Sequence, residues 1–236
     1  MLSGSKVGIV IIAYNNPDFI VLQAQKIKKF CKDDFQIVVV DNSTDKSASE
    51  GIKYHAEING CEYMKTNASS VKGSDSHSFA ANLSYFRIKG KYDYLFYIDH
   101  DCFPVIEFSV VEILGNKLMA GLGQHKNGRD YFWPGCLMWN NKDIDQSFIN
   151  FSPSAELGLD TGGGFHEFVE ANREKCIFFN EEHCQNPSFN KSFYNFYCMI
   201  NNGMFMHFVN GSNWNDSPEN EERINSLKNI LQEKTK

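Results

Sequence analysis

Residues Tyr94–Asp101 read YLFYIDHD and are the most informative part of the sequence for the fold. The first five residues are apolar or aromatic, which predicts a buried strand over Tyr94–Ile98. The polar residues Asp99, His100 and Asp101 follow directly. Side chains at i and i+2 of an extended segment point the same way, so both carboxylates can face one site at the carboxyl end of the strand. Such a pair suits a hard divalent cation, and the alternative is an ordinary acidic turn.

Two other apolar runs, VGIVIIA at Val7–Ala13 and FQIVVV at Phe35–Val40, predict further buried strands. Helical patterns alternate with these runs, which is typical of a parallel α/β sheet. Other elements are expected between these three strands. They are a helix that begins at Asn16–Pro17, a helix near Ala48–Glu57, a strand at Glu62–Lys65 and a loop at Thr66–Asp75. A helix at Ser76–Ile88 then follows, with Phe79, Leu83 and Phe86 facing inward.

The second half of the chain is less regular and predicts a mixture of strands and helices. The expected strands are Met119–Gln124, Phe132–Asn140, Cys176–Phe179 and Gly203–Val209. The expected helices are Phe165–Asn172 and an amphipathic closing helix over Pro218–Lys234, with Ile224, Leu227 and Leu231 inward.

Composition narrows the class of protein. The 236 residues carry 23 basic and 29 acidic side chains, a net charge of −6, which argues against general nucleic-acid binding. The longest apolar runs are far shorter than the roughly 20 residues that span a bilayer, and Met1–Lys6 has no signal-peptide pattern. We therefore expect a soluble, cytoplasmic protein without a membrane span, folded as one compact domain.

The seven cysteines never form a C-x-x-C pair. Zinc fingers and disulfide frameworks need closer or repeated spacing. A metal site is conceivable at Cys176, His183, Cys184 and Cys198, but their spacing does not match that of a zinc-binding motif. We expect buried, reduced thiols instead.

Polar residues also end the first two strands. Asp41 closes the second strand in the run VVDNS, where its carboxylate could accept hydrogen bonds from a base N–H or a ribose hydroxyl, or could cap the following turn. Ala13, Tyr14 and Asn15 end the first strand and offer an aromatic face and backbone amides to a base, although Tyr14 could equally pack in the core.

Together, the segments Val7–Asn16, Ile37–Asp45 and Tyr94–Pro104 resemble the three nucleotide-binding segments of GT-A-fold glycosyltransferases related to family 2. The resemblance is clear over residues 5–105 and loose beyond them. It implies an α/β fold with a mixed, mainly parallel sheet flanked by helices, in a single domain over residues 1–236. That domain would comprise a Rossmann-like nucleotide-sugar-binding half (about 5–105), an acceptor-binding half (about 106–215) and a C-terminal helix (216–236).

The resemblance implies metal-dependent transfer of a sugar from a nucleotide-diphosphate donor, with a UDP-sugar expected, to a glycan or other hydroxyl acceptor. Mn²⁺ or Mg²⁺ would be the cofactor. By the family's pattern, the site residues would be Asp41 for the nucleobase or ribose, Asp99 for the ribose, donor sugar or metal, Asp101 for the metal, His77 in the helix that closes over the diphosphate, and His207 as a third metal ligand. His207 is flanked by apolar residues, so a core histidine is the alternative. His100 departs from the family's small or acidic residue and would point into the fold or touch the donor.

A catalytic base and an acceptor platform are harder to assign. Asp160, in the run LDTGGG, could be a general base, a helix cap or a substrate contact. Glu156 and Asp143 are the alternative candidates for the base. A transferase that retains the configuration of the sugar would need no such base. Sugar rings stack on aromatic faces, which makes Trp133 and Trp214 the candidate acceptor residues, with Trp139 less well placed.

The chain lacks the sequence motifs of several other enzyme classes. No G-x-G-x-x-G follows the first strand, and the chain has no P-loop and no G-x-S-x-G elbow. A sugar-nucleotide nucleotidyltransferase would need a glycine-rich, basic loop where this chain has Tyr14–Asp18 (YNNPD). That enzyme class and a non-catalytic sugar-binding module on the same sheet remain the alternatives.

Overall fold

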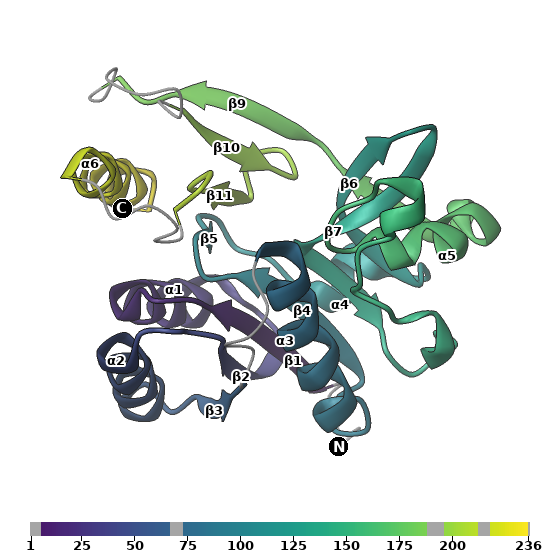
Figure 1. Ribbon diagram of the computed structural model, residues 1–236, viewed down its shortest axis with the longest axis horizontal. Helices are drawn as coiled ribbons and strands as arrows, with labels where there is room; N and C mark the ends of the chain where they lie inside the picture. Colours follow the sequence, from purple (N-terminus) through teal and green to yellow (C-terminus); the bar gives the residue numbers. More distant parts are fainter. Residues whose placement is uncertain (1–5, 67–72, 188–195, 212–217, 236) are drawn as a thin grey trace.

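The computed structural model describes residues 6–66, 73–187, 196–211 and 218–235, which form two sheets with helices packed around them (Figure 1). In the described part of the chain the larger sheet has seven strands in the order β3-β2-β1-β4-β7-β6-β8. The strands are β1 Lys6–Ala13, β2 Asp34–Asp41, β3 Glu62–Lys65, β4 Tyr94–Asp99, β6 Met119–Lys126, β7 Arg129–Asn140 and β8 Cys176–Phe179. β3, β2, β1 and β4 run parallel, and β7 then pairs antiparallel with β4.

The register of the parallel strands brings their polar ends together. Ala13 pairs with Asp41, and Ile12 pairs with Asp99. The apolar side chains of these strands alternate between two cores, because successive residues point to opposite faces. Helices α1 (Pro17–Phe30) and α2 (Lys46–Ile58) cover one face, and α3 (Gly73–Ile88) covers the other. The carboxyl edge of the sheet stays open for a ligand.

A second, antiparallel sheet stands over that edge. The four strands it has in the described residues follow the order β5-β11-β10-β9, with β5 Cys102–Pro104, β9 Glu181–Gln185, β10 Phe196–Ile200 and β11 Phe205–His207. Helix α6 (Pro218–Lys234) packs on one face through the predicted residues Ile224, Leu227 and Leu231. The remaining helices are α4 Val110–Leu114 and α5 His166–Ala171, with 3₁₀ turns at Gln146–Phe148, Ala155–Leu157, Gly163–Phe165 and Arg173–Lys175.

The α/β class with a mainly parallel sheet is confirmed, and two local predictions are wrong. Phe79 and Phe86 of α3 are 44% and 72% exposed. The inner face of α3 carries Ala80, Ala81 and Ser84 instead, because small side chains let the helix lie close to the sheet. The predicted loop Thr66–Asp75 ends too late, since the helix already begins at Gly73, and residues 67–72 of that loop lie outside the described residues. Within the described residues, no helix combines the length and apolar character that crossing a membrane requires.

Candidate functional site

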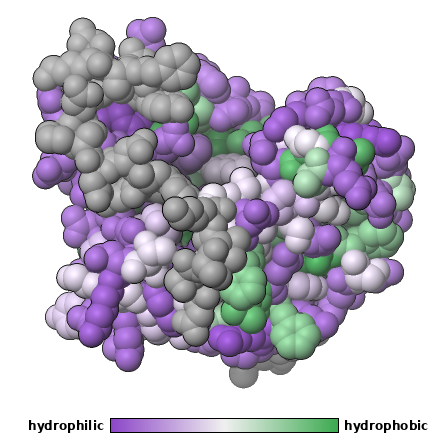
Figure 2. Space-filling view, in the orientation of Figure 1, coloured by the Kyte–Doolittle hydropathy of each residue, from purple (hydrophilic) through white to green (hydrophobic). Residues whose placement is uncertain are grey.

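A cavity of about 510 Å³ lies between the two sheets, above the end of β4. Figure 2 shows the surface hollowed between the part built on β6, β7 and α5 and the part that holds β9 and β10. The cavity is lined by Gly73, Ser74, His77, Asp99, Asp101, Leu122, Gly123, Gln124, Trp133, Thr161, Glu181, His207, Val209 and Asn210. The structure therefore brings together five sequence-predicted residues: His77, Asp99, Asp101, Trp133 and His207.

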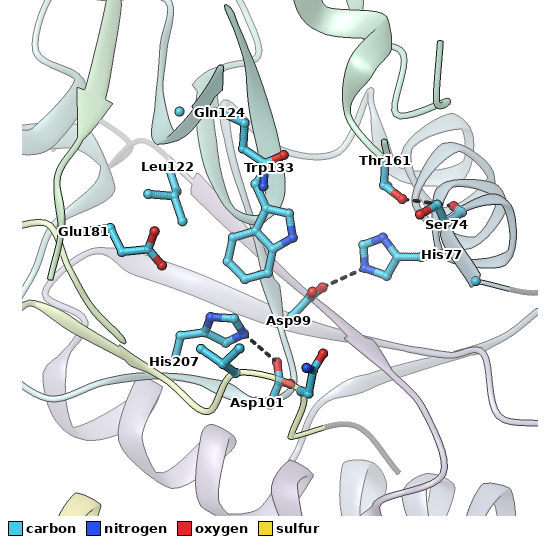
Figure 3. Close-up of a pocket in the computed structure, with 14 residues that line it drawn as sticks. Ser74, His77, Asp99, Asp101, Leu122, Gln124, Trp133, Thr161, Glu181 and His207 are labelled. Atoms are coloured by element: carbon cyan, nitrogen blue, oxygen red, sulfur yellow. Dashed lines mark hydrogen bonds and ion pairs between the residues drawn. The ribbon is translucent and has the colours of Figure 1, made fainter. Parts of the chain in front are cut away.

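Asp99 is paired with His77 across the cavity floor. The Nε2 atom of His77 lies 2.7 Å from Oδ1 of Asp99 (Figure 3). Burial alone would raise the pKa of Asp99, but the charge of His77 and its hydrogen bond outweigh burial and hold that pKa below its usual range. Burial likewise lowers the pKa of His77, and the attraction of Asp99 outweighs it, so the pKa of His77 is raised. The pair thus places a carboxylate and an imidazole within hydrogen-bonding distance on the cavity floor.

Asp101 faces His207 from the second sheet. Oδ1 of Asp101 lies 3.7 Å from Nε2 of His207, and both side chains are largely buried. The backbone carbonyl of Asp101 accepts a hydrogen bond from Phe208 N at 2.8 Å, which fixes the end of β11 against the turn after β4. Gly211 packs closely against Asp101. A side chain at this position would clash, because its Cβ would lie 2.8 Å from Cβ of Asp101. Residues about one hundred positions apart are thereby held at one point.

Trp133 forms an aromatic wall of the cavity. Its ring centroid lies 4.7 Å from that of His207, and Figure 3 shows the indole above the two aspartates. Trp139 is wrong as an acceptor candidate, because it is fully buried in the core against Tyr97. Trp214 lies outside the described residues.

Gln23 of α1 holds the turn that carries both aspartates. It is fully buried, and its Nε2 donates to the carbonyl oxygens of Asp99 at 2.7 Å and Cys102 at 2.8 Å. These two carbonyls flank the His100–Asp101 turn, so one amide group fixes the direction of both carboxylates. Sequence reasoning missed Gln23, although its place at i+3 from the inward Ile20 was a usable signal.

The resemblance to GT-A glycosyltransferases implies Mn²⁺-dependent nucleotide binding at Asp99 and Asp101. On that expectation Gln23→Leu should weaken the binding by about 10-fold, as losses of supporting groups around metal ligands commonly do. Isothermal titration at low temperature, where the variant is folded, measures this effect. Gln36→Leu is the matched control, because Gln36 also donates to two backbone carbonyls but at the far end of β2. A Gln23 variant with a lower melting temperature but unchanged affinity would show that the residue only stabilises the fold.

Asp41 does not line the cavity. Its carboxylate is fully buried and accepts hydrogen bonds from Ser43 N at 2.8 Å, Tyr63 Oη at 2.8 Å and Lys65 Nζ at 3.1 Å, and also from Ser49 Oγ. Burial raises the pKa of Asp41, but these hydrogen bonds outweigh burial and leave the pKa lowered. The geometry favours the turn alternative over contact with a nucleobase.

The other residues predicted at the nucleotide also lie off the cavity. Ala13 is buried, Tyr14 Oη lies 3.2 Å from Thr44 Oγ1, and the side-chain oxygen of Asn15 accepts from two backbone amides of the β2–α2 turn. These contacts join the ends of β1 and β2. Of the two readings of His100, the structure favours the one in which it points into the fold: it is buried, its Nδ1 accepts from Tyr14 N at 2.9 Å, and burial lowers its pKa. It does not line the cavity.

Asp160 lies off the cavity as well. Its side chain is exposed, forms an ion pair with Lys126 at 3.0 Å, and does not line the cavity, whereas the neighbouring Thr161 does. It caps no helix through its side chain either, since the N-cap residue of the following 3₁₀ turn, Gly163–Phe165, is Gly162. A Cβ on Gly162 would lie 2.1 Å from the carbonyl oxygen of Phe132, so this glycine allows the loop to pack closely against β7. The fallbacks Glu156 and Asp143 are exposed and lie outside the cavity as well.

Glu181 is the cavity carboxylate that sequence reasoning missed. It begins β9, a polar strand whose sequence EEHCQ gives no strand signal, and it lies beside His207 in Figure 3. Thr161, the neighbour of Asp160, also lines the cavity, and its Oγ1 donates to Ser74 O at 3.1 Å, joining the loop to the start of α3.

Solved structures with the same fold are nucleotide-sugar enzymes. The mannosyltransferase PcManGT from Pyrobaculum calidifontis, solved with GDP-Man and Mn²⁺, matches with a TM-score of 0.56 at 11% identity over 75% of this chain and 55% of that one. The chain therefore spans about 55% of the length of PcManGT. An active-site mutant of the galactosyltransferase LgtC matches with a TM-score of 0.50 at 13% identity over 94% of this chain and 95% of that one. The sequence matches no family model and no curated protein. The chain has the GT-A glycosyltransferase fold.

Proposed function

We propose that the chain is a metal-dependent glycosyltransferase that moves a sugar from a nucleotide-diphosphate donor, with UDP-sugars expected first, to a hydroxyl of a glycan or other acceptor. The observation that carries this proposal is the convergence of Asp99, Asp101 and His207 on one end of a cavity in a GT-A fold. The GDP-Man bound by PcManGT makes a guanine nucleotide the second donor to test.

The residues present fit a Mn²⁺ or Mg²⁺ ion. Carboxylate oxygens from Asp99 and Asp101 suit hard divalent cations, and the imidazole of His207 adds a ligand that Mn²⁺ accepts. When bound, such an ion neutralises charge that develops on the leaving diphosphate. Asp99 and Asp101 would hold it from the turn after β4, and His207 would hold it from β11.

The chain itself supplies further positive charge for the diphosphate. Asp99 holds the His77 imidazole at the cavity and raises its pKa, which favours the charged form, and α3 begins at Gly73 and Ser74, which line the same cavity. The first turn of a helix presents unpaired backbone N–H groups and the positive end of the helix dipole. His77 and the start of α3 would therefore orient the diphosphate, and Trp133 would stack on the acceptor sugar.

A binding screen followed by a transfer assay tests the proposal. UDP-, GDP-, CMP- and dTDP-sugars are each added with and without Mn²⁺, and the melting temperature is measured. A ligand at 100 times its Kd stabilises by about 2.7 kcal/mol, a rise of roughly 5–10 °C for a protein of this size. A Mn²⁺-dependent rise followed by sugar transfer to a panel of simple glycosides supports the proposal. Binding without transfer would support the sugar-binding module, and release of pyrophosphate from a nucleoside triphosphate and a sugar phosphate would support the nucleotidyltransferase.

A further inference from the structure

A row of potential metal ligands crosses the second sheet. His183 of β9 pairs with Cys198 of β10, and Cys198 pairs in turn with His207 of β11. Directly opposed residues of antiparallel strands place their side chains on the same face. Glu181 stands two residues before His183 and so shares that face. Four side chains that can bind metals therefore meet on one side of three adjacent strands.

Three of these side chains are close enough to hold one ion. A carboxylate oxygen of Glu181, the sulfur of Cys198 and a ring nitrogen of His207 all lie within 4.8 Å of one another. Bonds of about 2.0–2.3 Å to a tetrahedral Zn²⁺ place its ligands roughly 3.3–3.8 Å apart, so small side-chain rotations suffice. Nδ1 of His207 is shielded from solvent and has no hydrogen-bond partner among the described residues.

We propose that Glu181, Cys198 and His207 form a site for a thiophilic divalent cation such as Zn²⁺. Thiolate and imidazole ligands select Zn²⁺ over Mg²⁺ or Mn²⁺, which prefer the oxygen ligands offered by Asp99 and Asp101. The two sites share His207 and differ in every other ligand. The thiophilic site does not depend on glycosyl transfer, because none of its ligands requires a nucleotide.

Binding would form a metal–sulfur bond and release the Cys198 thiol proton to solvent. It would tie β9, β10 and β11 together at the wall of the cavity. Three protein ligands leave a fourth position for water or a substrate oxygen. Because His207 is shared, an ion bound to Cys198 also restrains the imidazole that faces Asp101.

Titration of the metal-stripped protein with Co²⁺ tests the site, because a Co²⁺–thiolate bond gives a charge-transfer absorption band that oxygen and nitrogen ligands do not. We expect the band to appear at one equivalent of Co²⁺ and to disappear when Zn²⁺ is added. Cys198→Ser should abolish the band. Cys184→Ser is the matched control and should keep it, because Cys184 pairs with Tyr197 and so lies on the opposite face of β9.

Two more variants keep the outcome unambiguous. Glu181→Ala changes an exposed residue and should lower Zn²⁺ affinity by at least about 10-fold even if Cys198→Ser fails to fold. Asp101→Asn should keep the Co²⁺–thiolate band while losing Mn²⁺-dependent nucleotide binding, which separates this site from the proposed function. Absence of the band, its persistence in Cys198→Ser, or unchanged Zn²⁺ affinity in Glu181→Ala would overturn the proposal.

Discussion

Replacing Asp101 with asparagine is expected to abolish Mn²⁺-dependent binding of a nucleotide sugar while the protein stays folded. Removal of groups that merely support metal ligands costs roughly 10- to 100-fold in affinity, so the loss of a direct carboxylate ligand should cost at least about 100-fold. Asparagine keeps the side-chain shape, and the backbone bond from Phe208 N to Asp101 O does not involve the carboxylate. Calorimetric titration of the nucleotide with and without Mn²⁺ measures the effect.

Asp160→Asn is the matched control for this experiment. It makes the same chemical change at an exposed carboxylate that pairs with Lys126 outside the cavity, and a surface ion pair contributes about 1 kcal/mol or less. We expect its nucleotide affinity, melting temperature and transfer rate to equal those of the wild type. Wild-type Mn²⁺ dependence in Asp101→Asn would refute the metal assignment, and a large loss of transfer in Asp160→Asn would return that residue to the catalytic centre.

The parallel half of the fold was predictable because its signals are local. Each of the strands β1, β2 and β4 is a short apolar run rich in β-branched or aromatic residues, and the first helix follows from a proline at its start and an apolar stripe. The carboxyl ends of neighbouring parallel strands must meet at one edge. Asp99 and Asp101 could therefore be placed at a ligand site from sequence alone, and the structure puts both at the cavity.

The second sheet was not predictable in the same way. β5 has three residues and pairs with β11, about one hundred positions later, and β9 is almost entirely polar. No local periodicity identifies such strands, because their pairing depends on long-range contacts. The sheet nevertheless brings His207 and Glu181 to the cavity. The metal site proposed at Cys198 also depends on this pairing and not on sequence spacing.

The direction of individual side chains was the least predictable feature. Asp160 and Thr161 are adjacent in a loop, and the structure turns Thr161 into the cavity and Asp160 toward Lys126. Asp41 stands at the expected strand end, but hydroxyl and ammonium donors from β3 and α2 surround its carboxylate. Position along a strand is set by local pattern, whereas orientation is set by which partners the neighbouring elements supply.

Asp41→Asn is expected to destabilise the fold strongly and to leave nucleotide affinity nearly unchanged. The substitution removes the buried charge that Lys65 pairs with and sets an amide against donors from Ser49 and Tyr63. Breaking a buried, hydrogen-bonded charge network of this kind should lower the free energy of unfolding by about 3 kcal/mol. For a protein of this size the melting temperature should fall by roughly 6–12 °C. Asp45→Asn is the control in the same turn, because asparagine caps α2 about as well as aspartate does.

The pH dependence of unfolding tests whether the ionised Asp41 carboxylate is the source of the stability lost in Asp41→Asn. The pKa of Asp41 is lowered in the folded protein, because the hydrogen bonds from Ser43, Ser49 and Tyr63 outweigh the effect of burial. The ionised carboxylate therefore stabilises the fold fully above the unfolded pKa of about 3.9, and this stabilisation is lost as the pH falls through the lowered folded value. Denaturant unfolding should show the full difference between wild type and Asp41→Asn near pH 7 and a shrinking difference below about pH 4. A variant as stable as the wild type but with nucleotide affinity reduced 10-fold or more would instead place Asp41 at the base, as its position at the end of β2 first suggested.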